Sequence, residues 1–502
     1  MELQLSYPFW LSNPKKEKTS SIQHPPQPHI PRTMTTQTLA HWSTDLTSTT
    51  LPPSVKHAAL RSLYNYIGCT IGGSNHPTVA KTHTALSPFF GPATSTLLGQ
   101  PDPKAKTDAQ HAALLNGIAS HVHDYDDTHL ATIIHPTGPV ASALLAYTDY
   151  ASNSSTQTPT TITGPALLTA LTAGIETSCK LGLALYPAHY DIGWHITSTT
   201  GAIGAAVAVA KLMGLAASQT EHAIGLAATQ QTGLREMFGS DTKSFHAGRA
   251  AQNGLLAALL AQRGFTSSER ALEARRGWGR VVSGLGVGEL EEGRAERELE
   301  RRVGELGVTW EVEANAFKPF PCGIVCHPVI DGCIRAREEL EMRGVRVEEV
   351  VRVEVEVHPL VIELTAKREP RDGLEAKFSV FHGGAVGLLF GKAGPAEYAD
   401  EVVGREEVVA LRDRIEATPS EELRSDEARL IVHLSSGETV EKHVVHAVGS
   451  LEVPMTDEQL TRKFVDQAAL VLGEDQAKKA SDAAWSVEKL EDAAEAWRPK
   501  SS

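Results

Sequence analysis

The chain has 502 residues, a formal net charge of −14 and a hydrophobic content of 41%. A chain of this length buries a large core and is expected to form more than one domain. Its acidic balance disfavours nucleic acid and anionic membrane surfaces as partners. No run of about 18 or more uninterrupted apolar residues predicts a transmembrane helix. The five cysteines are spread over the chain and do not suggest a disulfide framework, which favours a reducing, cytoplasmic compartment.

Residues 1–35 are predicted to form a disordered arm. The segment is rich in Pro, Ser and Lys and shows no helical period. It lacks the basic start and apolar centre of a secretory signal. A mitochondrial address stays open as an alternative, and Met34 is an alternative start of translation.

Residues 36–310 are predicted to form an all-α domain. Apolar residues recur there at helical spacing, and small residues recur every three or four positions, so the helices are expected to approach closely in a compact bundle. The ranges with the clearest helical pattern are 51–73, 107–127, 163–185, 200–215, 220–231 and 248–265. The charged, Gly-punctuated segment that follows is expected to form surface helices and loops.

Residues 311–449 are predicted to form a smaller α+β lid domain. Residues 347–364 alternate apolar and charged side chains, which is typical of a half-exposed strand, and residues 427–445 read as a hairpin. Helices are expected over 378–394 and 405–417. Residues 450–502 return to helical patterns, over 456–473 and 481–497. The prediction is therefore a mainly α protein, in which a helical domain built from both ends of the chain is interrupted by the lid.

Titratable side chains concentrate in the stretch His121–Gly138, "HVHDYDDTHLATIIHPTG". If the preceding helix persists, His121, Asp124 and Thr128 share one of its faces. His135 then begins a turn, "HPTG", that leads into the next helix. A buried Asp beside a His provides a general base near neutral pH, so we expect a catalytic site here.

The three aspartates of this stretch, Asp124, Asp126 and Asp127, lie too close together to be all buried and ionised. At least one is expected to face water or to cap a helix. Helix capping with exposed carboxylates is the structural alternative for any single one of them.

A metal site is the main rival interpretation. No His-x-x-x-His or Glu-x-x-His pair lies on a clear apolar helix face. Cys322, Cys326, His327 and Cys333 lack a second matching knuckle, and they are expected to be buried structural thiols. We therefore predict no metal.

Several basic groups could bind an anion. Lys243, His246 and Arg249 fall at the start of a small-residue helix, where an anion is favoured; Lys243 is the better candidate for binding and Arg249 for a structural pair. Lys318 lies between Phe317 and Pro319, and we expect it to project into a cleft between domains. His195 either binds an anion or is a satisfied core histidine.

Taken together, the stretches "DYDDT…HPTG", "GWH…TGAIGAA…KLMGL", "TKSFHAGRAAQNGLLAALLAQRGF", "FKPFPCG…H…ID" and "AKFSVFHGGAVGLLFG" resemble the MmgE/PrpD family. They occur in family order over roughly residues 36–490. The resemblance implies a helical domain split around an α+β lid, a homodimer, and no metal or organic cofactor. It also implies that a small anionic tricarboxylic acid binds between the helical domain and the lid.

The resemblance also implies site residues. The family's catalytic residues fall on Asp124, Thr128 and His135, and its two substrate-binding lysines on Lys243 and Lys318. His195, His246 and His382 complete the predicted substrate-binding set.

Two departures bear on the reaction. Gly323 stands where decarboxylase members carry His, and His382 stands where they tend to carry Tyr, so both changes disfavour a decarboxylase. The expected activity is dehydration of a 2-methylcitrate or alkylcitrate-type acid. Decarboxylation of cis-aconitate to itaconate, epimerisation or isomerisation of a related acid, and a helical binding or interaction protein are the alternatives.

Overall fold

The computed structural model describes residues 34–100, 105–153 and 160–498. The predicted N-terminal arm lies outside these residues except for its last two positions. The described part is mainly α-helical, as predicted. None of its helices combines the length and the apolar character needed to cross a membrane.

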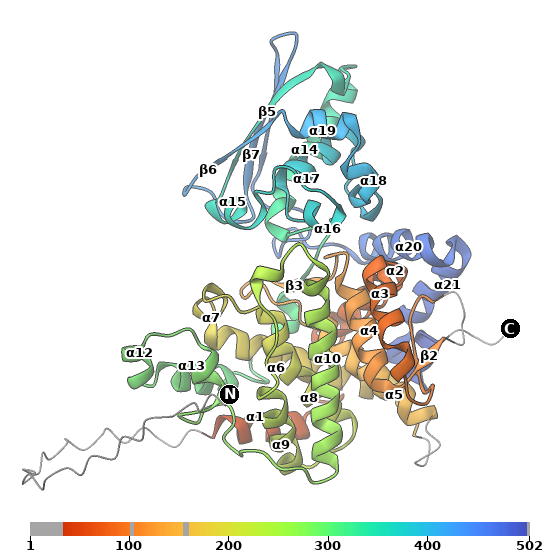
Figure 1. Cartoon of the computed structure of the whole chain (residues 1–502), viewed down its shortest axis with the longest axis vertical. Coiled ribbons are helices and arrows are strands. Elements are labelled where there is room, and N and C mark those ends of the chain that lie inside the picture. Colours follow the sequence, from red (N-terminus) through yellow and green to blue (C-terminus); the bar gives the residue numbers. More distant parts are fainter. Residues whose placement is uncertain (1–33, 101–104, 154–159, 499–502) are drawn as a thin grey trace, which may run out of the picture. The chain divides into compact units, whose positions relative to one another are not determined.

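The first core is helical and is built around α4, α5, α6, α8 and α10, which lie side by side in Figure 1. Small residues bring these helices together: a Cβ atom on Gly117 of α4 would meet the Cα of Gly248 in α10 at 2.5 Å. The predicted close approach is thus confirmed. The helices of this region are α1 (Thr35–Asp45), α2 (Pro53–Gly73), α3 (Pro77–Leu86), α4 (Ala109–His121), α5 (Thr137–Asn153), α6 (Gly164–Leu185), α7 (Ala188–Asp191), α8 (Ile196–Leu212), α9 (Ala217–Ala228), α10 (Asp241–Gln262), α11 (Trp278–Val282), α12 (Val287–Glu291) and α13 (Arg294–Gly304).

The C-terminal helices α20 (Asp457–Leu472) and α21 (Glu474–Trp485) join this same core. The ring of Phe464 in α20 lies 4.7 Å from the ring of Tyr64 in α2, measured between centroids. A Cβ on Gly68 would meet the same phenylalanine ring at 2.7 Å, so glycine lets α20 lie against α2. Beyond Trp485 the predicted helix gives way to short 3₁₀ turns.

The second core lies within residues 320–440 and combines a sheet with helices. Its four strands have the order β6-β5-β7-β8; β5 is parallel to β6 and antiparallel to β7, and β7–β8 is the predicted hairpin. Strand β5 alternates buried and more exposed side chains over its second half, as its sequence predicts. The elements are α14 (His327–Met342), β5 (Val350–Val357), α15 (Pro359–Thr365), α16 (Gly373–Ala376), α17 (Val380–Phe390), α18 (Asp400–Val403), α19 (Glu406–Arg412), β6 (Ile415–Pro419), β7 (Ala428–Leu434) and β8 (Thr439–Val444).

A short antiparallel pair connects the two regions. Strand β3 (Asp127–His129) follows α4, and strand β4 (Asn315–Phe317) leads into the lid sequence. Their register pairs Asp127 with Phe317 and Thr128 with Ala316. This pairing brings the residue after β4, Lys318, next to the loop that precedes β3. Two further two-residue strands, β1 (Ser95–Thr96) and β2 (Lys106–Thr107), pair with each other elsewhere.

Candidate active site

The loop between α4 and β3 places the acidic side chains. Helix α4 ends at His121. The prediction that His121, Asp124 and Thr128 share one helix face is therefore wrong. Asp124 instead adopts a left-handed backbone with φ of 52°, and Thr128 lies in β3. Aspartate tolerates this conformation better than most residues because its short side chain forms local hydrogen bonds. The reversal turns the Asp124 carboxylate toward the lysines of α10 and of the segment after β4.

All three aspartates of the loop are buried, so none of them faces water, which was one of the two outcomes expected for at least one of them, the other being a helix cap. Each has its own compensation. Asp127 accepts hydrogen bonds from Thr137 Oγ1 at 2.5 Å and from Asn315 Nδ2, and burial raises the pKa of Asp127 to about 6. Asp124 and Asp126 have cationic or histidine partners instead. The sequence argument failed because it could not place these partners. Lys243, Lys318 and Asn315 come from distant segments, and the histidines of the same stretch could not be oriented from the sequence.

Asp124 lies between two ammonium groups. Its Oδ1 atom is 2.6 Å from Lys243 Nζ and 2.9 Å from Lys318 Nζ, and Lys318 also donates to the Asp124 carbonyl oxygen at 3.2 Å. Burial alone would raise the pKa of Asp124, but the two lysines outweigh it and hold the pKa well below its usual range. Burial lowers the pKa of Lys243, although Asp124 opposes that change. The site therefore holds two buried cations that share one internal carboxylate.

His135 is oriented by a backbone carbonyl. Its Nδ1 atom lies 2.9 Å from the carbonyl oxygen of Asp127, and because a carbonyl only accepts, Nδ1 carries the proton. Nε2 then keeps its lone pair and lies 4.0 Å from Asp124 Oδ1. Burial lowers the pKa of His135, so the imidazole is neutral at physiological pH. A neutral imidazole with a free Nε2 beside a cavity is suited to accept a proton.

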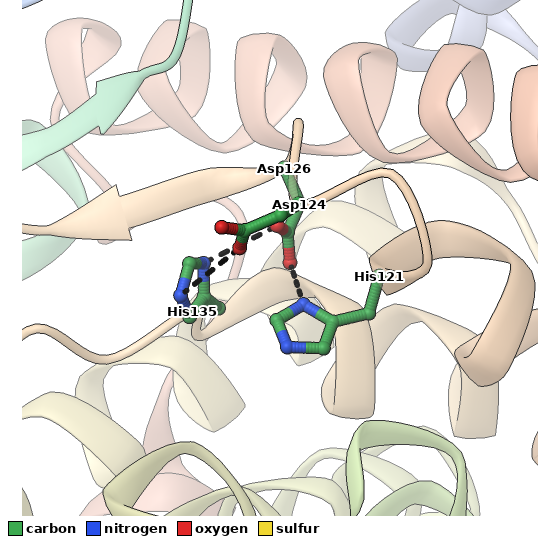
Figure 2. A group of neighbouring side chains, drawn as sticks. All are labelled: His121, Asp124, Asp126 and His135. Carbon is green, nitrogen blue, oxygen red and sulfur yellow. Dashed lines mark hydrogen bonds and ion pairs between the residues drawn. The ribbon is translucent and has the colours of Figure 1, made fainter. Parts of the chain in front are cut away.

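Asp126 interacts with both histidines, as the dashed lines in Figure 2 mark. One of its carboxylate oxygens pairs with His121 Nδ1 at 2.7 Å, and the other lies 3.3 Å from His135 Nδ1. These two histidines hold the pKa of Asp126 well below its usual range against the opposing effect of burial. Asp126 is thus placed to stabilise an imidazolium that forms on His135. The sequence showed Asp126 and His121 in the right stretch but did not distinguish them from their neighbours.

The four residues drawn in Figure 2 also have the donor types of a metal site, with ligand atoms within 4.8 Å of one another. Their surroundings do not fit a cation. The Lys243 and Lys318 ammonium groups already occupy Asp124 Oδ1, and a divalent ion there would meet two positive charges at contact distance. The donor set is therefore better matched to proton transfer than to metal binding.

A cavity opens beside these groups. Asp124, Thr128, His135, His195, Lys243 and Lys318 all contribute to its lining. The side chains that complete the lining are mostly apolar; the residues are Ile133, Tyr190, Phe238, Gly323, Ile324, Val325, Leu364, Thr365 and Phe378. The structure thus brings six of the eight predicted site residues to one cavity that also receives lid residues.

The other two predicted residues lie behind or away from the cavity lining. His246 of α10 is buried, and its Nδ1 lies 3.0 Å from Nδ1 of His195, so it contacts a lining residue rather than the cavity. His382 of α17 is buried in the lid, where its Nε2 donates to the carbonyl of Glu397 at 3.0 Å. Neither is placed for direct contact with a ligand. Arg249, expected to pair with an acid, donates to the Gln252 side chain at 2.6 Å.

The sequence analysis missed two buried lysines near the site. Lys463 of α20 donates to the carbonyl of Tyr125 at 2.6 Å and lies 4.1 Å above the ring of that tyrosine. Lys377, after α16, lies 3.4 Å from the Pro321 carbonyl. Burial lowers the pKa of each lysine to about 8. Lys377 lay in a quoted motif, but Lys463 follows an ordinary amphipathic pattern and carried no local signal.

Comparison with known proteins identifies the family. The MmgE/PrpD N-terminal domain matches residues 37–288, and the MmgE/PrpD C-terminal domain matches residues 320–489. The chain belongs to the MmgE/PrpD family. The two matched ranges contain every residue that lines the cavity except Lys318, which lies between them.

Three relatives span most of this MmgE/PrpD chain. A "cis-aconitate decarboxylase-like protein oryM" of Aspergillus oryzae is 25% identical over 92% of this chain and 96% of its own length. A cis-aconitate decarboxylase of Aspergillus terreus is 27% identical, covering 91% of this chain and 94% of its own. A 2-methylcitrate dehydratase of Salmonella typhimurium is 25% identical over 70% of this chain and 71% of its own. Relatives of similar identity thus carry the names of two different reactions.

Proposed function

We propose that this MmgE/PrpD protein is a lyase that dehydrates a citrate-like tricarboxylic acid of the 2-methylcitrate or alkylcitrate type. Its relatives are named as enzymes, which supports catalysis over a purely binding role. A binding scaffold would not need Asp124, His135, Lys243 and Lys318 to converge on one cavity, as they do here. No metal or organic cofactor enters the proposal, and we propose a homodimer, as the family resemblance implies.

The neutral His135 is the observation that carries the choice of reaction. Dehydration begins with removal of a carbon-bound proton, which requires a base with a free lone pair. The hydrogen bond from Nδ1 to the Asp127 carbonyl leaves Nε2 free in this way. After the transfer, the imidazolium is stabilised by Asp126, 3.3 Å away.

The lysines supply the remaining requirements. As the proton leaves, negative charge develops on the neighbouring carboxylate of the substrate, and the ammonium groups of Lys243 and Lys318 stabilise it. The substrate hydroxyl then leaves as water, taking a proton from Lys243, whose lowered pKa makes it a stronger acid than a free lysine. The carbon–oxygen bond breaks as the carbon–carbon double bond forms, and the proton on His135 later restores the lysine. In an acidic chain, this local pair of cations is also what attracts a polyanion.

Decarboxylation of cis-aconitate is the second candidate, because the two Aspergillus relatives carry the decarboxylase name. That reaction ends with protonation of a carbanion, so its histidine must start as a proton donor. Burial lowers the pKa of His135 and of His195, the other histidine in the lining, and Gly323 adds no further histidine to the cavity. Both observations favour dehydration.

A substrate panel with the purified protein separates these candidates. Methylcitrate, longer alkylcitrates, citrate and cis-aconitate are incubated with enzyme, while proton NMR follows alkene formation and a second assay follows carbon dioxide. We expect alkene from the alkylcitrates without release of carbon dioxide. Carbon dioxide from cis-aconitate together with inert alkylcitrates would reverse the assignment.

A further inference from the structure

The cavity is lined by two chemically different sets of side chains. One carries the acid–base and ammonium groups described above. The other, here named the apolar wall, consists of Ile133, Tyr190, Ile324, Val325 and Leu364. The carboxylates and hydroxyl of a citrate head do not pack favourably against such an apolar surface. Covering the surface with an apolar group of the ligand would stabilise the complex.

The apolar wall is built with some conformational cost. Ile133 has a φ of 58°, a left-handed conformation that is unfavourable for a β-branched residue. Its half-buried side chain packs with Tyr190 and Phe238 in a small apolar cluster that is separate from the two main cores. The fold therefore holds an isoleucine at the cavity that neither main core requires.

Gly323 lines the cavity beside the apolar wall and adds no side chain to it. Its φ of −54° is available to any residue, so the backbone does not demand glycine. A Cβ there would meet Thr365 Cγ2 at 3.2 Å, which is tighter than ordinary van der Waals contact. A side chain at this position would therefore crowd Thr365, which also lines the cavity.

A charged pair bounds the apolar wall. Arg235 stacks on the ring of Tyr190 at 3.8 Å and lies 3.3 Å from Glu363, the neighbour of Leu364. The Arg235 side chain is 18% exposed and the Glu363 side chain 61% exposed, so this pair lies toward solvent. An apolar group that extended beyond the wall toward this pair would meet charged side chains instead of apolar ones.

We propose that the apolar wall binds an alkyl tail of the substrate that is longer than a methyl group. This inference rests on the proposed citrate-like substrate, whose head binds at the lysines. The five wall residues come from the loop after β3, from α7, from the turn before α14 and from α15. One methyl group cannot touch side chains from all four segments, whereas a chain of several carbons can. The Arg235–Glu363 pair then limits the tail length.

The test uses binding of acids that cannot react. Propane-1,2,3-tricarboxylate is compared with its C1-methyl, C1-propyl and C1-pentyl derivatives by calorimetry on the full chain. Each added methylene is expected to tighten binding about threefold, at least up to propyl. Affinity that is flat or falls from the unsubstituted acid to the propyl derivative would overturn the proposal. Because these ligands lack the leaving hydroxyl, the series reports on the wall even if the alkylcitrates prove not to be dehydrated.

Two variants on the same helix sharpen the test. Leu364→Ala removes a wall residue, and Leu360→Ala removes a half-buried leucine one turn earlier that does not line the cavity. We expect Leu364→Ala to reduce the ratio of pentyl to unsubstituted affinity about fivefold and Leu360→Ala to preserve it. Equal ratios in both variants and in the unaltered protein would contradict a role for the wall. Thermal unfolding of each variant establishes that the comparison is between folded proteins.

Discussion

Replacing His135 by glutamine removes the proposed base while keeping a polar side chain of similar reach. In the structure, His135 is the neutral group whose Nε2 stays free, because Nδ1 is committed to the Asp127 carbonyl. Lys243 and Lys318 do not depend on it, since their shared partner is Asp124. The change therefore removes proton transfer and leaves the anion clamp in place.

General-base catalysis contributes about 10²- to 10⁴-fold, so kcat should fall by that factor, or about 3–5 kcal/mol in activation free energy. KM should stay within about threefold of its original value, because the clamp is intact. The pH profile gives a second signature. Activity needs the neutral imidazole and is lost as pH falls through the pKa of His135, which burial places below the ordinary 6.5. The acid limb of kcat/KM should lie below that pH and disappear in His135→Gln.

The assay is alkene formation followed by proton NMR, with exchange of the substrate's carbon-bound hydrogen for solvent deuterium as an independent measure of proton abstraction. His123→Gln is the matched control: His123 is half-buried in the same stretch, its Nε2 lies 3.2 Å from the Gly72 carbonyl, and it does not line the cavity. A folded His135→Gln protein that keeps more than a tenth of the original kcat, with deuterium exchange intact, would refute the assignment of the base.

Three more predictions follow from the charges around the site. Lys243→Met should lower kcat/KM about 10²- to 10⁴-fold, with a fall in kcat as well as a rise in KM, because it removes both the proposed proton donor to the leaving hydroxyl and a charge-assisted contact to the substrate. Unchanged kinetics would remove Lys243 from both roles. Lys463→Met should lower kcat about tenfold with KM unchanged, because Lys463 binds the carbonyl of Tyr125, the residue between Asp124 and Asp126. Lys463→Arg should restore part of the lost kcat. Equal kinetics in both variants and in the unaltered protein would show that Lys463 does not position the loop. The unfolding temperature should fall steeply between pH 6.5 and pH 4, because burial lowers several histidine pKa values to about 4 and the unfolded chain therefore binds more protons in that window. Each such histidine lowers the free energy of unfolding by about 1.4 kcal/mol per pH unit of acidification. Calorimetry showing constant stability from pH 7 to pH 5 would contradict this. These histidines are His76, His121, His189, His246 and His382.

Periodic features of the fold were predictable because a single segment encodes them. Helix α2 occupies 53–73 within the predicted 51–73, and the β7–β8 hairpin turns where the sequence places Ser-Ser-Gly-Glu. The end of α4 was not predictable in this way, because the residues after His121 are compatible with helix. The left-handed Asp124 and the β3–β4 pairing end it, and the partner strand is nearly 190 residues away.

The same distinction separates the site residues. Asp124 and His135 were found because they lie in one dense stretch, and Lys318 because its neighbours were unusual for a solvated lysine. Their convergence, however, depends on contacts 119 and 194 residues apart in the chain. Lys463 shows the limit of sequence reasoning most clearly. Its role arises entirely from the packing of α20 against α2, which no local pattern reports.

The origin of the site residues bears on how relatives in one family can carry the names of two reactions. The Asp124 carboxylate and His135 come from the two loops that flank β3. The lysines that share the carboxylate come from α10 and from the position directly after β4, so these groups form one contiguous polar cluster. Gly323, Ile324, Val325 and Leu364 come from the lid and face the same cavity. A substitution in the lid can therefore change which acid is held, and which bond lies near His135, without disturbing the charges that move the proton. On this argument we expect substitutions on the lid side of the cavity, and at Gly323 in particular, to affect the choice between loss of water and loss of carbon dioxide.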